Sequence, residues 1–114
     1  MVETDRSIAS KQVEGSPVYG RSGERLGTID HLMFDKASGR YYAVVRLGTL
    51  LGINERYYPV PWTALAYDTR LGGFIADIDP SRLFMAPRHA KRSSPELSDQ
   101  TYFRRVDEFW GSPR

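Results

Sequence analysis

Few side chains in the sequence could carry out catalysis. There is no cysteine, so neither a disulfide nor a thiolate metal site is possible, and there are only two histidines, His31 and His89. Catalytic use of a histidine requires a positioned partner, so we interpret His31 as a partly buried strand histidine with a local hydrogen bond. No nucleophile elbow, phosphate-binding loop or dinucleotide motif is present. We therefore predict that the protein is not an enzyme and has no catalytic residue and no cofactor.

Three aspartates, Asp68, Asp77 and Asp79, lie close together in a predicted hairpin. A cluster of carboxylates could hold a hard cation. Solvation at a strand edge, and a helix-capping role for Asp79, explain the same residues without a metal. We predict no metal ligands, and a small-ligand or metal-binding barrel remains the second alternative function.

A basic segment follows, in which Arg88, His89, Lys91 and Arg92 could bind phosphate groups of RNA or of an anionic membrane. No aromatic residue is interleaved among them for base stacking, which favours a solvated basic linker over residues 88–97. The net charge of +2 is also too small to indicate a nucleic-acid-binding protein. Nucleic acid therefore stays an alternative partner.

The first residues are polar. Met1 to Glu14 lack an apolar run, so we expect a flexible leader over residues 1–16 and neither a signal peptide nor a membrane anchor. No stretch approaches the roughly 20 apolar residues that span a bilayer. These features predict a cytoplasmic protein without membrane insertion.

Turn-forming clusters divide the middle of the chain into short β-strands. Ile29, Leu32 and Phe34 share the inward face only if a bulge lies near Asp30-His31, and we predict that bulge. The six predicted strands indicate a small barrel or sandwich. They cover Val18-Tyr19 and residues 25–35, 40–47, 56–62, 64–68 and 73–78.

Successive side chains of a strand point to opposite faces of the sheet, and this alternation assigns the faces of the predicted strands. In the third strand Tyr41, Ala43, Val45 and Leu47 fall on one side, and the side that carries Arg46 is expected to face water. The fourth strand contains two prolines, which cannot donate to a β-ladder, so it should lie at an edge or end there. In the last strand the inward residues are Phe74, Ala76 and Ile78.

The pattern becomes helical towards the C-terminus. Asp79-Pro80 predicts a short helical turn over residues 81–85, and Ser98 or Asp99 caps an amphipathic helix within residues 98–111. Its apolar side chains fall in an arc of about 120°. Because about twelve residues do not stay helical alone in water, the helix must dock on its own barrel or on that of a second subunit. The apolar residues are Tyr102, Phe103, Val106, Phe109 and Trp110.

Three segments in order carry a family resemblance. Residues 23–35 read G-x-x-L-G-x-I-x-x-L-x-F-D and are followed by Ser38-Gly39, residues 48–55 read GTLLGINE, and Val60-Pro61-Trp62 precedes Leu65. This arrangement resembles the PRC-barrel domain family over roughly Pro17 to Ala86. His31 stands where that family often has an acid.

The resemblance implies a mostly β fold: a small six-stranded PRC-type β-barrel over residues 17–87, with a short helical turn and a C-terminal amphipathic helix. Such barrels occur in the cytoplasmic part of the photosynthetic reaction-centre H subunit, in a ribosome-maturation factor, and as free-standing bacterial proteins. We expect the free-standing type, since no membrane helix is present and only sixteen residues precede Pro17.

The predicted function is a homodimeric, non-catalytic protein-binding and assembly module, peripheral to a membrane-bound or photosynthetic electron-transfer complex. The first alternative is a ribosome- or RNA-associated maturation factor. The predicted interface combines the five apolar helix residues with a loop that carries Leu50, Leu51 and Ile53. Loops rarely place three large aliphatic side chains so close together, although the same residues could instead plug one end of the barrel.

The double change Leu50→Ser with Leu51→Ser separates these two roles of the loop. For an interface, we expect an unchanged melting temperature and weaker self-association or partner capture, because polar side chains remove apolar contact area. Thermal melts and light scattering at several protein concentrations measure both quantities. A loss of thermal stability at every concentration would instead identify the loop as a plug.

Overall fold

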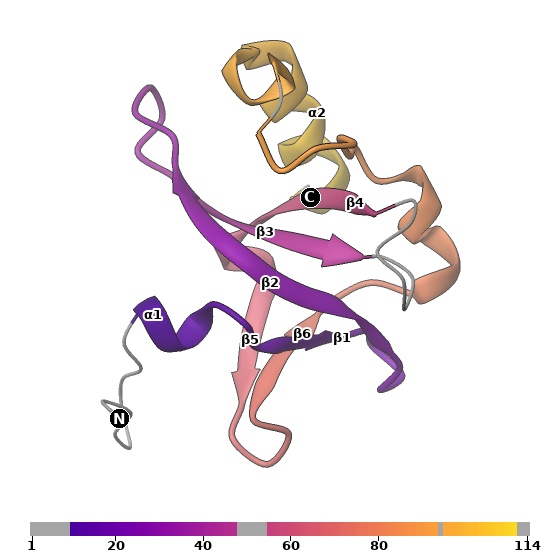
Figure 1. The fold of residues 1–114 in the computed structure, drawn as a ribbon. Helices are drawn as coiled ribbons and strands as arrows, with labels where there is room; N and C mark the ends of the chain where they lie inside the picture. Colours follow the sequence, from indigo (N-terminus) through magenta and orange to yellow (C-terminus); the bar gives the residue numbers. More distant parts are fainter. Residues whose placement is uncertain (1–9, 48–54, 94, 112–114) are drawn as a thin grey trace.

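Six strands form one curled sheet in the computed structural model, which describes residues 10–47, 55–93 and 95–111 (Figure 1). The strand order is β4-β3-β2-β1-β6-β5, antiparallel throughout except for the parallel pair β1 and β6. The predicted mostly β, six-stranded fold is therefore confirmed, as a half-barrel whose end strands β4 and β5 do not pair. The strands are β1 (Pro17–Tyr19), β2 (Arg25–Phe34), β3 (Tyr41–Leu47), β4 (Arg56–Pro61), β5 (Leu65–Asp68) and β6 (Gly73–Ala76).

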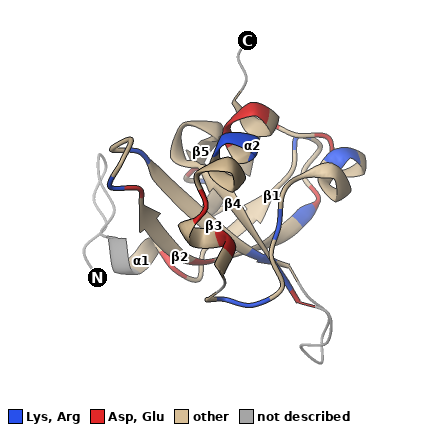
Figure 2. Ribbon diagram, turned by 90° about the horizontal axis from the view of Figure 1, so that it is seen from above, with Lys and Arg blue, Asp and Glu red and all other residues tan. Residues whose placement is uncertain are grey.

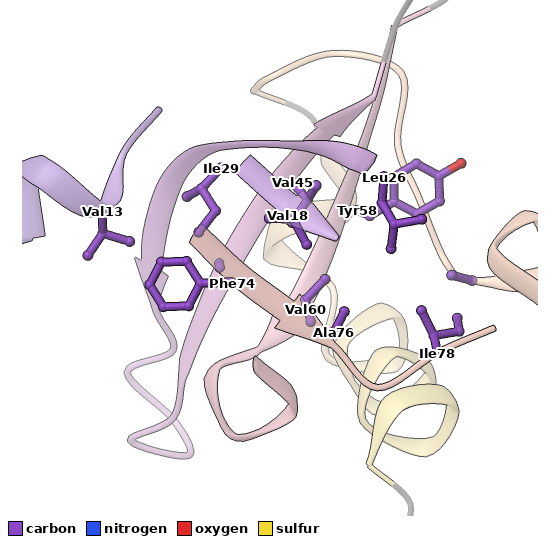
Figure 3. Packing of buried hydrophobic residues seen from close by; sticks show 12 residues of the cluster. Val13, Val18, Leu26, Ile29, Val45, Tyr58, Val60, Phe74, Ala76 and Ile78 are labelled. Atoms are coloured by element: carbon purple, nitrogen blue, oxygen red, sulfur yellow. The ribbon is translucent and has the colours of Figure 1, made fainter. Parts of the chain in front are cut away.

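Side chains on the concave face of this sheet form the main core. Figure 3 shows Val18, Ile29, Val45, Val60 and Phe74 converging from five different strands. Each of these side chains is buried, and the predicted inward residues Ala76 and Ile78 join them. Sheet curvature lets residues far apart in the sequence share one interior. Gly27 permits the close crossing of β2 and β3, since a Cβ there would lie 2.5 Å from the carbonyl oxygen of Arg46.

The predicted bulge in β2 is confirmed. Ile29 pairs with Val45 and His31 pairs with Val44, so Asp30 has no partner in the ladder. The extra residue shifts the parity of the strand, which allows both Ile29 and Leu32 to pack on the core. The shift does not bring Phe34 inward, because β2 runs past the edge of the core and Phe34 is 51% exposed.

Strand β3 is buried on both faces, which corrects the expectation that its second face meets water. Ala43 and Val45 face the main core, and Tyr42 and Val44 are also buried. Tyr42 packs with Tyr102 and Val106 of helix α2 (Gln100–Trp110), which covers the outer face of the sheet. No helix in the described stretches is both long and apolar enough to cross a bilayer.

The N-terminal segment is not a flexible leader throughout. Residues Ser10–Val13 form a short helix, α1, and the Val13 side chain is buried in the main core. The backbone N–H of Gly15 donates to the carbonyl of Ile29, and the N–H of Ile29 donates to the carbonyl of Ser16. These bonds continue the pairing of β1 and β2 by two residues, so the ordered fold begins before Pro17.

Aspartates cap the N-termini of the two helical elements predicted near the C-terminus. Asp79 accepts from the N–H of Ser81 and caps the 3-10 helix η2 (Pro80–Met85), and Asp99 accepts from the N–H of Thr101 at the start of α2. Short 3-10 segments also occur as η1 (Trp62–Ala64) and η3 (Pro95–Ser98).

The fourth strand lies at one edge of the sheet and ends at Pro61, as its prolines predict. Its outer side is partly covered by the segment that links η2 to η3. There Tyr57 and His89 exchange two backbone hydrogen bonds, of 2.9 and 3.0 Å.

Val45→Asp should strongly destabilise the fold, because it places an unpaired charge in the main core, at a cost of several kcal/mol. Tyr41→Asp is the matched control, since Tyr41 lies on the same strand but is 55% exposed. Urea unfolding of both variants measures the difference. Equal free energies of unfolding would show that the face assignment of β3 is wrong.

Candidate partner-binding surface

The β2–β3 hairpin ends in a turn held by its own side chains. Asp35 accepts a hydrogen bond from the Ser38 hydroxyl at 2.7 Å and another from the N–H of Ala37. The bond from Ser38 is the main reason that the pKa of Asp35 lies below its usual value. Gly39 adopts a positive φ of 77°, which closes the turn. The residues that flank it are therefore presented on a rigid support.

Two aromatic side chains stand at the base of this turn. Phe34, the last residue of β2, and Tyr41, the first of β3, are cross-strand neighbours with ring centroids 4.9 Å apart. They are 51% and 55% exposed. Strand alternation assigned both to the inward face, which is wrong because the hairpin extends beyond the core. Two adjacent exposed aromatic rings are a feature of interaction surfaces.

Asp107 of α2 joins the helix to the base of the hairpin. One carboxylate oxygen accepts a hydrogen bond from the Tyr42 hydroxyl at 2.8 Å, and the other pairs with Arg40 at 2.7 Å. Burial of Tyr42, and then its bond to Asp107, raise the pKa of this phenol to about 12. The hydroxyl therefore remains a proton donor to Asp107 at physiological pH, and the helix is fixed relative to the hairpin.

Two grooves flank the Arg40–Asp107 ion pair. The first, of about 810 Å³, lies between the hairpin and the start of α2, with Phe34 and Phe103 in its walls. The second, of about 770 Å³, lies between the hairpin and the end of β4, with Tyr41 and Trp62 in its walls. Arg40, Arg104 and Asp107 line both grooves. We call the hairpin aromatics and these two grooves the hairpin face.

The C-terminal helix packs on its own barrel. Of its predicted interface residues, Tyr102 and Val106 are buried against Tyr42. The other three are half-buried: Phe103 contacts the Tyr42 ring at a centroid distance of 4.9 Å, and Phe109 and Trp110 pack on the main core. Leu50, Leu51 and Ile53 lie outside the described residues.

The predicted basic patch is only partly present at the surface, where Arg88 and Lys91 are exposed. His89 is only 2% exposed, and its Nδ1 lies 2.7 Å from the Tyr102 hydroxyl, so it is a buried residue rather than part of a solvated linker. Arg92 pairs with Asp30, and Arg88 donates to the carbonyl of Phe84. Sequence reasoning missed the burial of His89 because its neighbours are polar and the strand that it pairs with is distant in sequence.

The bulge residue Asp30 organises a separate charged cluster. His31 forms the local hydrogen bond that was predicted, from Nδ1 to Asp30 at 2.7 Å. Burial raises the pKa of Asp30, but the hydrogen bonds from His31 and Arg92 outweigh it and hold the pKa below its usual value. Arg46, expected to face water, is half-buried between Asp30 and Glu55, at 3.6 and 3.4 Å. These groups neutralise one another.

The interior of the half-barrel is filled. The space between Val18, Leu26, Tyr58 and Trp110 is about 10 Å³, at most enough for one water molecule. Within the described ranges, no three histidine or carboxylate side chains are placed to hold a metal. Asp68 accepts from the backbone of its own turn, Asp77 pairs with Arg21, and Asp79 caps η2.

Comparisons with known proteins concern mainly the barrel. A family model described as the PRC-barrel domain matches residues 5–83. RimM of Pseudomonas aeruginosa, a 16S ribosomal RNA processing protein by its description, has a similar solved structure, with 24% sequence identity and a TM-score of 0.49. The match covers 66% of this chain and 46% of that chain, so this protein spans about half the length of its structural neighbour. None of the curated proteins matches the sequence.

The buried His89 should make stability depend on pH. Burial is the main cause that lowers the pKa of His89 from 6.5, so the unfolded chain binds a proton more readily than the folded chain. Above pH 6.5 His89 is neutral in both the folded and the unfolded chain, and the free energy of unfolding has its full value. As the pH falls from 6.5 towards the lower pKa of the folded state, only the unfolded chain gains the proton, and the free energy of unfolding decreases. Melting temperatures between about pH 7.5 and about pH 5 should show this decline, and His89→Gln should flatten it. An identical slope in the variant would exclude His89 as the cause.

Proposed function

Because the chain belongs to the PRC-barrel domain family, we propose that it is a non-catalytic protein-binding and assembly module, whose binding site is the hairpin face. The observation that carries this proposal is the exposed pair Phe34 and Tyr41, held at the base of a rigid turn between two grooves. Large aromatic side chains at the centre of a patch contribute most to binding between proteins.

The hairpin face combines apolar walls with a charged rim, which is the composition of a protein interface. Lys36 and Arg104 border the first groove, and Arg104 and Glu108 border the second. The turn around Asp35 and the link from Asp107 to Tyr42 and Arg40 keep the walls in place. A pre-organised surface loses less conformational entropy when a partner binds.

Catalysis is not part of the proposal. The titratable groups between the two grooves are committed to one another: the Tyr42 hydroxyl donates to Asp107, and the same carboxylate binds Arg40. Tyr42 is 1% exposed, so a substrate would not reach its hydroxyl without displacing α2. A general acid or base must contact the proton that it transfers.

The partner that we propose is a protein subunit of a membrane-bound electron-transfer complex, of the photosynthetic type in which the family's barrels occur, with this chain acting as a homodimer. The hairpin face supports a protein partner in preference to RNA. The walls of the two grooves carry acidic as well as basic side chains, and Figure 2 shows both signs of charge along α2, so basic residues do not collect on the hairpin face. A nucleic-acid surface requires such a collection.

The double variant Phe34→Ser with Tyr41→Ser should lose partner binding but keep its fold, because both rings are exposed. We expect a change in unfolding free energy below about 1 kcal/mol and at least a tenfold loss of captured protein partners. Affinity capture from native lysate with quantitative mass spectrometry, and sedimentation for the dimer, measure these effects.

Leu71→Ser is the matched control, since Leu71 is 44% exposed and lies in the β5–β6 turn, away from the hairpin face. It should capture the same partners as the unmodified protein. Capture of membrane-complex subunits that depends on Phe34 and Tyr41 supports the proposal. Equal capture by both variants, or enrichment of ribosomal proteins and RNA alone, would contradict it.

A further inference from the structure

The two most exposed large apolar side chains lie in η2, away from the hairpin face. Among the described residues, Phe84 is 69% exposed and Met85 is 62% exposed. Figures 1 and 2 place η2 and the β2–β3 hairpin on opposite sides of the molecule. Neither groove of the hairpin face includes Phe84 or Met85. The hairpin face therefore does not account for their exposure.

The geometry of η2 forces these side chains outward. In a 3-10 helix, residues three apart lie on the same side, and Leu83 and Ala86 use that spacing to pack on the main core. Phe84 and Met85, which lie between them, must then point towards solvent. Asp79 caps the first turn, and Arg88 donates to the carbonyl of Phe84 at 2.6 Å. Two bulky apolar side chains thus protrude from a short segment that is fixed at both ends.

The charge around this projection is positive. Residues 80–93 contain four lysines and arginines and no carboxylate. Arg92 is neutralised by Asp30, whereas Arg82, Arg88 and Lys91 form no ion pair with any residue that the structure describes. Arg82 lies over the Phe109 ring, 5.6 Å from its centroid. Two carboxylates precede this segment: Asp77 pairs with Arg21, and Asp79 caps η2 and interacts with both Arg21 and Arg82.

We propose that η2 is a contact site for an anionic lipid surface. A convex pair of apolar side chains suits the boundary between lipid headgroups and acyl chains, where Phe and Met lose water while flanking arginines stay among the phosphates. Each cation near such a surface strengthens binding about fivefold at moderate salt. This contact lies opposite the hairpin face, so the protein can touch a bilayer and a protein partner at the same time.

Vesicle flotation with the full chain tests the contact. The probes are phosphatidylcholine vesicles, and the same vesicles with about one-third phosphatidylglycerol. We expect binding to the anionic vesicles only, weakened by salt. Phe84→Ser with Met85→Ser should reduce binding at least tenfold, and Arg82→Gln with Arg88→Gln should reduce it about twenty-fivefold, at about fivefold for each arginine. Phe34→Ser with Tyr41→Ser should leave it unchanged, which separates this contact from the proposed function.

A second measurement reports insertion directly. Phe84→Trp should show quenching by brominated lipid, whereas Tyr41→Trp, on the hairpin face, should not. Thermal melts show that each variant is folded. Three results would each overturn the proposal: no binding of the unmodified protein to anionic vesicles, equal binding by Phe84→Ser with Met85→Ser, and binding of an RNA oligonucleotide that depends on Arg82 and Arg88 in the absence of vesicle binding.

Discussion

The burial of β3 on both faces is the constraint on which the rest of the structure depends. Ala43 and Val45 fill the half-barrel, so the Tyr42 side chain must be covered from outside, and α2 covers it. A buried phenol requires a hydrogen-bond acceptor, which Asp107 supplies. The same carboxylate binds Arg40 and so sets the helix against the hairpin. The segment that leads to α2 must then cross the edge of β4, where His89 contacts the Tyr102 hydroxyl.

Short sequence patterns predicted much of this fold, because the features they predict are determined by residues close together in the sequence. The parity of Ile29 and Leu32 required a bulge, and Asp79 and Asp99 occupy the positions where a carboxylate caps a helix. The covering of β3 was missed because alternation was applied to a strand that is apolar on both faces. Residues Tyr41 to Val45 contain no charged side chain, a pattern that is typical of a strand covered on both sides. The amphipathic helix and this second apolar face are complementary halves of one contact.

The candidate surface was less predictable than the fold. Phe34 and Tyr41 have the inward parity, and only the projection of the hairpin beyond the core exposes them. His89 has polar neighbours in sequence, and only its pairing with Tyr57 buries it. Phe84 and Met85 fall within a helical turn whose anchors, Leu83 and Ala86, are equally apolar. In each case, the exposure of the side chain depends on the position of its segment relative to the core. The type of residue alone does not indicate that position.

The two edge strands of the half-barrel, β4 and β5, limit how the protein can assemble. An open sheet exposes backbone donors and acceptors that could recruit further strands and lead to aggregation. At one end, Pro59 and Pro61 remove two donors from β4, and His89 occupies the backbone of Tyr57. At the other end, β5 is only four residues long. Growth by backbone pairing is therefore suppressed at both ends, so association must rely on side-chain surfaces. Contacts between side-chain surfaces can close into assemblies of finite size, whereas edge-to-edge strand pairing can continue from one chain to the next.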